Sequence, residues 1–284
     1  MKAVRSMLFA PGDRPDLIAK AARSPADGVI VDLEDGVAMG VKKEARANLG
    51  SLPDGEVSFF VRLNGFDSGL MWEDLLAAAH ASVAGVIIPK VEQRRVMLKV
   101  CGALSALEAA TGHPDGSIAL VPMIETALGV QNAFEIVGGS PRVQAVMLGS
   151  GEQGDLVADL RAQWDPEGTG LHYSRSRVLL AARSAGVAQP IDGVFMDYRN
   201  LEGLRTESRL ARRMGYVAKL AIHPAQVAVI NEVFTPTEEE LVRNRAILEA
   251  FEEAESRGKA AVSVEGRMVD YAVARTARSV LEGS

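Results

Sequence analysis

The chain has 284 residues and a formal net charge of −6, with 48% hydrophobic but only 5% aromatic residues. This composition is typical of cores packed from Val, Leu, Ile and Ala, as in buried parallel strands covered by helices. The acidic balance argues against nucleic acid as a partner, because a general phosphate-backbone binder needs a basic face.

Two further features concern the cellular compartment. The first apolar stretch is too short for a signal peptide, and no run reaches the roughly 18 apolar residues of a membrane span. A single cysteine, Cys101, suits a reducing compartment. We therefore expect a cytoplasmic protein with no membrane contact.

Short β-rich apolar runs alternate with helical patterns along the chain. The helical segments include 71–83 and 174–187, where apolar residues recur at spacings of three and four, as in crossover helices. Eight such alternations without a break in composition favour a closed (β/α)₈ TIM barrel over an open doubly wound sheet. The runs that predict strands cover residues 6–12, 28–35, 57–64, 85–92, 118–126, 143–151, 191–197 and 216–224.

The pattern changes after the eighth run. We expect a barrel over residues 1–233 and a C-terminal extension over 234–284 that packs on the barrel or on a neighbouring subunit. In the extension, Thr237 and Glu240 form a capping-box pattern at the start of a helix. The other expected elements are the end of that helix at Gly258, a hairpin-like flap over 259–270 and a last helix over 271–282.

Most of the apolar runs end in a polar or charged residue. In a barrel these ends share the C-terminal rim, where active sites are built. The sequence therefore predicts a functional site on that rim. Its candidate residues are Asp32, Glu34, Asp35, Arg62, Asn64, Lys90, Glu92, Glu125, Asp197 and His223.

Glu125 ends the apolar run "ALVPMIET". A carboxylate there must be solvated, paired or metal-bound, because burying it alone and ionised costs several kcal/mol. An acid beyond the next strand could share a cation with it, and two carboxylates completed by water and substrate describe a Mg²⁺ site. The scattered histidines disfavour zinc. The alternative for Glu125 is a salt bridge to a rim Arg or Lys.

The segment "GSGEQGDLVADL", residues 149–160, offers three acids for the second ligand position. It lacks the Gly-Lys-Ser/Thr ending of a phosphate-binding loop, and its acids would repel phosphate. Asp159 lies a full helical turn beyond Asp155. If Glu152 binds the metal, Asp155 caps the helix that follows.

Arg62 is the arginine best placed on the rim. Its planar fork matches a substrate carboxylate bidentately, and the alternative is an ion pair with Asp32 or Glu34. Those two acids stand at alternate positions and face alike, so we expect them to support the metal site by orienting its ligands.

Eight segments, in order along nearly the whole chain, resemble the citrate lyase beta-subunit (CitE-like) family of the 2-keto-acid aldolase and malyl-CoA lyase superfamily. The resemblance implies a TIM barrel that forms a homotrimer or hexamer, binds Mg²⁺ and cleaves or forms a carbon–carbon bond next to a thioester. The segments are "RSMLFAPGDRPDLIAKA", "GVIVDLEDGV", "VRLN", "IIPKVE", "MIETALGVQNAFEI", "IDGVFMDYRNLEGL", "AKLAIHPAQVAVINEVFTPTEEE" and "GRMVDYAVARTA".

For the citrate lyase subunit, the implied reaction converts a citryl thioester into oxaloacetate and an acetyl thioester. The carrier is CoA or an acyl carrier protein, and citrate lyase partner subunits are a further implication. Alternative readings are a malyl- or citramalyl-CoA lyase, a malate synthase-like enzyme or a thioesterase. A non-catalytic subunit that binds a keto acid is the last alternative.

The resemblance also implies roles for individual residues. Arg62 of "VRLN" matches the arginine that binds a substrate carboxylate, and Glu125 of "MIET" matches a metal ligand at the substrate. Asp270 of "GRMVD" matches an aspartate that reaches a neighbouring subunit's site as an acid or base in related enzymes. Its alternative role is to cap the helix that begins at Tyr271.

The loop after the sixth run departs from the family pattern, which usually reads Leu-Gly-Ala-Glu-Asp-Leu with the Asp as second metal ligand. Here "LGSGEQGDL" carries about three extra residues. Counting forward from Leu148 places Glu152 in the ligand position. Counting back from "DLVADLRAQWDPEGTGLHYSRSR", which keeps the family spacing, places Asp155 there, and we favour Asp155.

Overall fold

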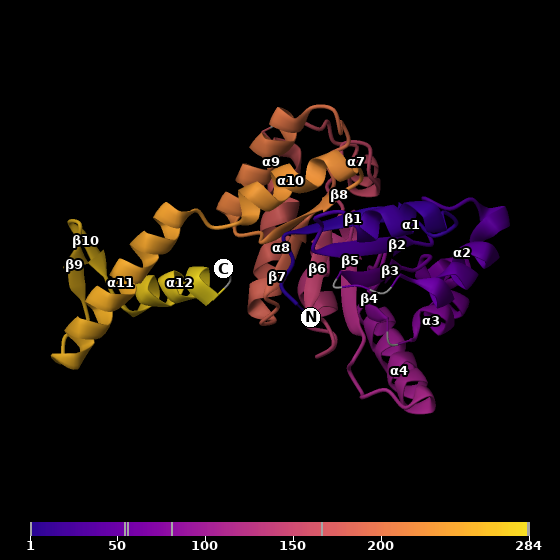
Figure 1. Ribbon diagram of the computed structural model, residues 1–284, viewed down its shortest axis with the longest axis horizontal. Coiled ribbons are helices and arrows are strands. Elements are labelled where there is room, and N and C mark those ends of the chain that lie inside the picture. The colour runs from indigo at the N-terminus through magenta and orange to yellow at the C-terminus, as the bar shows by residue number, and fades with distance from the viewer. Residues whose placement is uncertain (1, 54, 56, 81, 166, 283–284) are drawn as a thin grey trace. The chain divides into compact units, whose positions relative to one another are not determined.

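The computed structural model describes residues 2–282, apart from residues 54, 56, 81 and 166 (Figure 1). It divides into two compact units, Met1–Phe234 and Thr235–Ser284. Residue 81 of the expected helix 71–83 lies outside the described residues. So do residues 1 and 283–284, at the ends of the two expected domains.

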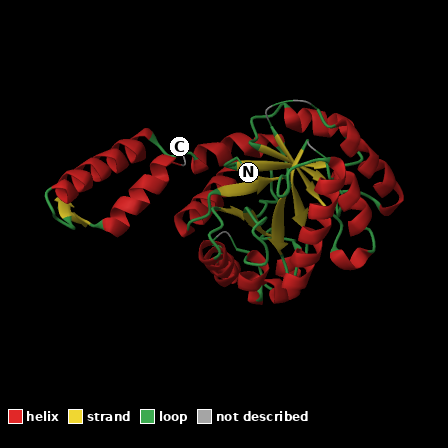
Figure 2. Cartoon of the chain, turned by 90° about the horizontal axis from the view of Figure 1, so that it is seen from below, coloured by secondary structure: helices red, strands yellow, loops and turns green. Residues whose placement is uncertain are grey.

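The first unit is a closed barrel of eight parallel strands in chain order, with β8 pairing back to β1. Helices surround the strands, which converge on a common centre in Figure 2. The TIM-barrel prediction is therefore confirmed. The strands are β1 (Ser6–Pro11), β2 (Gly28–Asp32), β3 (Ser58–Arg62), β4 (Val83–Ile88), β5 (Ala119–Ile124), β6 (Ala145–Leu148), β7 (Gln189–Asp192) and β8 (Ala218–Ala221).

In the described part of this unit, helices of five to eighteen residues and four one-turn 3₁₀ helices follow the strands. No helix among the described residues has both the length and the apolar character needed to cross a membrane. The helices are α1 (Pro15–Ala22), α2 (Lys42–Asn48), α3 (Met71–Ala78), α4 (Arg94–Thr111), α5 (Ala127–Gln131), α6 (Ala133–Val137), α7 (Asp155–Leu160), α8 (His172–Ser184), α9 (Leu201–Met214) and α10 (Pro224–Phe234). The 3₁₀ helices are Met39–Val41, Leu49–Ser51, Phe66–Ser68 and Thr169–Leu171.

The expected strand runs are mostly longer than the observed strands, and two expected elements extend five residues beyond the observed ends. The seventh strand was expected over 191–197 but covers Gln189–Asp192, because the apolar residues after Gly193 pack as a loop: Phe195 is buried against Trp164. The helix expected over 71–83 ends at Ala78, because its last apolar residue, Val83, begins β4.

The core has an inner and an outer layer. Side chains inside the barrel form one cluster, and a larger cluster fills the space between the strands and the helices. Ile30, Phe60 and Met123 belong to the inner layer. Since side chains two apart on a strand face alike, the residues two positions further on also face inward, at the rim. Those residues are Asp32, Arg62 and Glu125.

The second unit is a helical hairpin whose two helices are joined by a β-hairpin. The capping box of Thr237 and Glu240 is present, so the predicted helix start is confirmed. Phe251 and Tyr271 pack edge to face, with ring centroids 5.0 Å apart. The elements are α11 (Glu238–Ser256), β9 (Val262–Val264), β10 (Arg267–Val269) and α12 (Tyr271–Glu282).

Candidate active site

A cavity of about 570 Å³ opens at the C-terminal ends of the barrel strands. Its lining combines apolar side chains, such as Phe9 and Met123, with the backbone of the loops after β6 and β7. It brings together five of the residues expected from the sequence, which are Asp32, Asp35, Arg62, Glu125 and Asp155.

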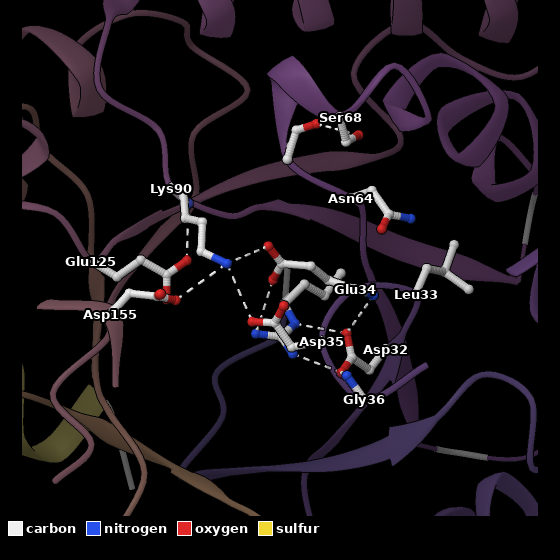
Figure 3. A network of polar contacts seen from close by, with 12 residues as sticks. Asp32, Leu33, Glu34, Asp35, Gly36, Asn64, Ser68, Lys90, Glu125 and Asp155 are labelled. Carbon is white, nitrogen blue, oxygen red and sulfur yellow. Dashed lines mark hydrogen bonds and ion pairs between the residues drawn. The ribbon is translucent and has the colours of Figure 1, made fainter. Parts of the chain in front are cut away.

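Glu125 directly follows β5 and is only 5% exposed. Its Oε1 accepts a hydrogen bond of 2.9 Å from the backbone nitrogen of Lys90 (Figure 3), so the contact brings no compensating charge. Burial, together with the nearby carboxylates of Glu34 and Asp155, raises the pKa of Glu125 to about 7. The ionised carboxylate is therefore costly unless a cation joins it.

The glycine-rich segment before α7 lies against Glu125. A Cβ atom on Gly149 would lie 2.5 Å from the Cβ of Glu125, so only glycine allows the end of β6 to come this close. The chain then turns and enters α7 at Asp155. The glycine-rich segment thus brings Asp155, the acidic first residue of α7, into the same cavity as Glu125.

The three acids of this segment have different surroundings. Asp155 lines the cavity, and its Oδ2 lies 3.2 Å from Nζ of Lys90. Glu152 is exposed and is not among the lining residues. Asp159 instead accepts a hydrogen bond of 2.6 Å from the backbone nitrogen of Ala127, at the start of α5.

These positions lead to different expected effects on Mg²⁺ binding. Asp155→Asn should weaken Mg²⁺ binding by at least about tenfold, because a neutral amide is a poorer ligand for a hard cation. Glu152→Gln removes the same charge three residues earlier and should change the affinity by less than about twofold. Calorimetric titration with MgCl₂ measures both. The reverse ranking would place the ligand at Glu152.

Arg62 is held by two carboxylates while it lines the cavity. Its Nε and one terminal nitrogen donate to Asp32 at 2.7 and 2.6 Å, and the other terminal nitrogen lies 3.2 Å from Glu34. Although burial opposes it, the Arg62 guanidinium lowers the pKa of Asp32. A guanidinium has more N–H donors than these contacts use, so Arg62 can still bind a substrate carboxylate.

Lys90, which the sequence placed on the rim without a role, forms ion pairs with several of the site's carboxylates. Its Nζ lies 2.9 Å from Glu34 and 3.2 Å from both Asp35 and Asp155, so one ammonium joins the segment after β2 to the start of α7 (Figure 3). Although partial burial opposes it, the hydrogen bond to Glu34 raises the pKa of Lys90. Its φ of 49° is unusual for a residue other than glycine.

The donor groups of the site fit Mg²⁺. Among the described residues, no group of three or more His, Cys, Asp or Glu side chains is arranged to hold a metal, as a closed zinc site would require. Mg²⁺ commonly takes one or two carboxylates and keeps several waters. The cluster also has more carboxylates than cationic groups, with Asp32, Glu34, Asp35, Glu125 and Asp155 against Arg62 and Lys90.

Comparison with known proteins extends these observations. Residues 5–224 match the family model described as HpcH/HpaI aldolase/citrate lyase. The chain belongs to this family. One relative is citrate lyase subunit beta of Leuconostoc mesenteroides, which is 34% identical over 98% of this chain and 92% of its own length. Another is L-malyl-CoA/beta-methylmalyl-CoA lyase of Cereibacter sphaeroides, which is 35% identical over 98% of this chain and 93% of its own length.

Two solved structures share the fold of this chain. CitE of Mycobacterium tuberculosis in complex with magnesium, acetoacetate and coenzyme A is 32% identical, with a TM-score of 0.78 over 98% of this chain and 97% of that one. A structure of the citrate lyase beta subunit of M. tuberculosis with oxaloacetate and magnesium is also 32% identical. It has a TM-score of 0.66 over 82% of this chain and 98% of that one.

Proposed function

We propose that this member of the HpcH/HpaI family is a Mg²⁺-dependent carbon–carbon lyase. It cleaves a citryl thioester into oxaloacetate and an acetyl thioester. Alternatively, it cleaves a related 3-hydroxyacyl thioester into another 2-keto acid and an acetyl thioester. The observation that carries the proposal is the meeting of Glu125, Asp155 and Arg62 in one cavity on the barrel rim. The magnesium, oxaloacetate and coenzyme A bound to the M. tuberculosis relatives support it.

Each residue of the site has a role in this reaction. Glu125 and Asp155 hold Mg²⁺, which supplies positive charge against the oxygen charge that develops during cleavage. Arg62 binds a carboxylate of the substrate, while Asp32 and Glu34 keep its guanidinium in place. A base takes the hydroxyl proton and the carbon–carbon bond breaks to give the keto acid. The thioester enolate that leaves is then protonated.

Asp270 is the proposed acid or base, acting from a neighbouring subunit of a homotrimer or hexamer. Its Oδ1 accepts hydrogen bonds of 2.9 and 3.1 Å from the backbone nitrogens of Ala272 and Val273, so it caps α12 as well. The cap uses only one carboxylate oxygen, which leaves the other for proton transfer.

Action from a neighbouring subunit has a specific expected result. Asp270→Asn and Glu125→Gln should each be inactive alone, but mixed oligomers made by co-expression should recover up to about a quarter of the wild-type rate. This fraction follows because random mixing pairs an intact Glu125 with an intact neighbouring Asp270 in about one site in four. The rate of keto-acid release measures the recovery. No recovery in verified mixed oligomers would contradict the role of Asp270 across subunits.

The substrate is tested with a panel of thioesters. Purified protein with Mg²⁺ and citryl-, malyl- or citramalyl-CoA should release a keto acid from at least one of them. The similarity to the Cereibacter sphaeroides lyase makes malyl-CoA the second candidate. Release of free thiol without a keto acid would indicate a thioesterase, and formation of malate and free CoA from acetyl-CoA, glyoxylate and water a malate synthase-like enzyme. Tight Mg²⁺-dependent oxaloacetate binding without any turnover would contradict the lyase and favour a binding subunit.

We also propose that the protein works in the cytoplasm, with CoA or an acyl carrier protein as thioester carrier and citrate lyase subunits as further partners. The similarity to citrate lyase subunit beta supports the partner subunits. Gel filtration of the protein alone and after co-expression with candidate subunits tests the assembly.

A further inference from the structure

A cluster of four charged side chains is buried between the barrel and helices α8 and α9, apart from the residues assigned above. This buried quartet consists of Arg175 of α8, Asp192 of β7, Glu207 of α9 and Lys219 of β8, which are between 0% and 3% exposed. Arg175 donates to Asp192 at 3.0 Å and to Glu207 at 2.8 Å. Lys219 donates to the same two acids at 2.6 and 3.0 Å. The charges therefore balance within the quartet.

Stability alone is a poor explanation for this arrangement. Removing ions from water carries a large desolvation penalty, and well-packed apolar side chains of similar volume are often as stable or more so. Oε2 of Glu207 is buried without a hydrogen-bond partner among the described residues, which adds to the cost. The quartet therefore calls for a further role.

Ser150 connects the quartet to the loop of the candidate site. It is 0% exposed, and its Oγ donates to Asp192 at 3.2 Å and lies 3.4 Å from a terminal nitrogen of Arg175. The same oxygen accepts a hydrogen bond of 3.1 Å from the backbone nitrogen of Gly193, which joins the ends of β6 and β7. A Cβ atom on Gly193 would lie 2.5 Å from the backbone nitrogen of Ser150, so the two loops are in close contact.

The next residues along the same loop belong to the site. Gly149 packs against Glu125, and the loop ends at Asp155, the first residue of α7. Ser150 therefore follows Gly149, which contacts the proposed ligand Glu125, and it lies five residues before the other proposed ligand, Asp155.

We infer that the buried quartet is a positioning device for the metal site. Through Ser150 it fixes the start of the 149–154 loop, so that the carboxylates of Glu125 and Asp155 are held near each other before a cation binds. The inference rests on the proposed function, which assigns Mg²⁺ to these two carboxylates. A loop fixed in advance loses less conformational freedom when the ion binds, which favours affinity.

The first test removes only the hydroxyl that links the quartet to the loop. Ser150→Ala should weaken Mg²⁺ binding by about tenfold, the size of effect that groups orienting a metal ligand commonly have. The matched control is Ser208→Ala, because Ser208 of α9 is also 0% exposed but its hydroxyl has no hydrogen-bond partner among the described residues. It should change Mg²⁺ affinity by less than about twofold. Calorimetric titration with MgCl₂ at pH 8 gives both affinities, and thermal unfolding in EDTA shows whether the variants fold equally well.

The second test replaces the whole quartet by apolar residues, with Arg175→Met, Asp192→Leu, Glu207→Leu and Lys219→Met combined. A folded variant should bind Mg²⁺ at least about tenfold more weakly, which a purely structural role would not require. If this variant does not fold, Ser150→Ala decides alone. Unchanged Mg²⁺ affinity in Ser150→Ala overturns the inference. The proposed function does not depend on this result, because the loss of activity in Glu125→Gln tests it separately.

Hydrogen exchange keeps the inference testable without the metal. In metal-free protein, the amides of the 149–154 loop should exchange faster in Ser150→Ala than in the wild type and in Ser208→Ala. A wild-type protein that binds no Mg²⁺ contradicts the proposed metal site. The exchange rates then show by themselves whether the quartet fixes the 149–154 loop through Ser150. Equal exchange rates in all three proteins overturn that role.

Discussion

Glu125→Gln is expected to lower kcat/KM for thioester cleavage by about 10³-fold, because stabilisation of the reacting oxygen by a metal contributes several kcal/mol. The substitution keeps the shape of the side chain and an oxygen that can accept from Lys90, but it removes the charge that would bind the ion. Release of keto acid at saturating Mg²⁺ measures the loss. Activity at the wild-type level with the metal site occupied would remove Glu125 from the mechanism.

The matched control for this substitution is Glu92→Gln. Glu92 is also on the rim, but it is absent from the lining of the cavity that contains Glu125. It should keep kcat/KM within about twofold of the wild type, since a partly exposed charge outside the cavity is screened by solvent. A comparable loss in both variants would point to the general charge of the rim rather than to a ligand.

The affinity for Mg²⁺ is expected to rise about tenfold per pH unit up to a pH of about 7 and then to level off. Its cause is the pKa of Glu125, which is about 7 in the folded protein against an ordinary value of 4.5. Below pH 7 the ion must displace a proton from this carboxyl group, and above pH 7 it need not. Calorimetric titrations in two buffers of different ionisation enthalpy should show release of about one proton at pH 6 and almost none above pH 8.

The same shift predicts the sign of a stability change in metal-free protein. The contribution of Glu125 to the free energy of unfolding is fully present below the unfolded pKa of 4.5. It is lost as the pH rises through the folded pKa of about 7, because the folded state keeps the proton longer than the unfolded state. Thermal unfolding in EDTA across this range measures the change. Glu125→Gln should lack this dependence of stability on pH. A wild-type protein whose Mg²⁺ affinity does not change with pH would contradict the assignment of the ion to Glu125.

Much of the barrel and part of the site follow from local sequence patterns. Asp32, Arg62 and Glu125 could be placed on the rim because each follows an apolar run, and strand alternation decides which way they face. The end of β7 could not be placed in this way. Its loop residues after Gly193 are as apolar as a strand, and one of them, Phe195, is buried like a strand residue.

Other parts depend on contacts between distant segments. The choice among Glu152, Asp155 and Asp159 depends on where α7 begins and how it packs. The ammonium of Lys90 joins the site through a long side chain and a positive φ that no local pattern predicts. Arg175 and Glu207 resemble solvent-facing charges of amphipathic helices, and only the folded structure shows that they are buried.

The hydrogen bond between Asp159 and the backbone nitrogen of Ala127 bears on tolerance to insertion. It links α7 to the segment that follows Glu125, and it lies beyond the 149–154 loop. The loop is therefore anchored at both ends, by Ser150 at its start and by the packing of α7 at its end. Only residues 151–154 lie between these anchors. A change in length confined to these residues would leave both anchors in place, so we expect it to leave Asp155 at the proposed metal site.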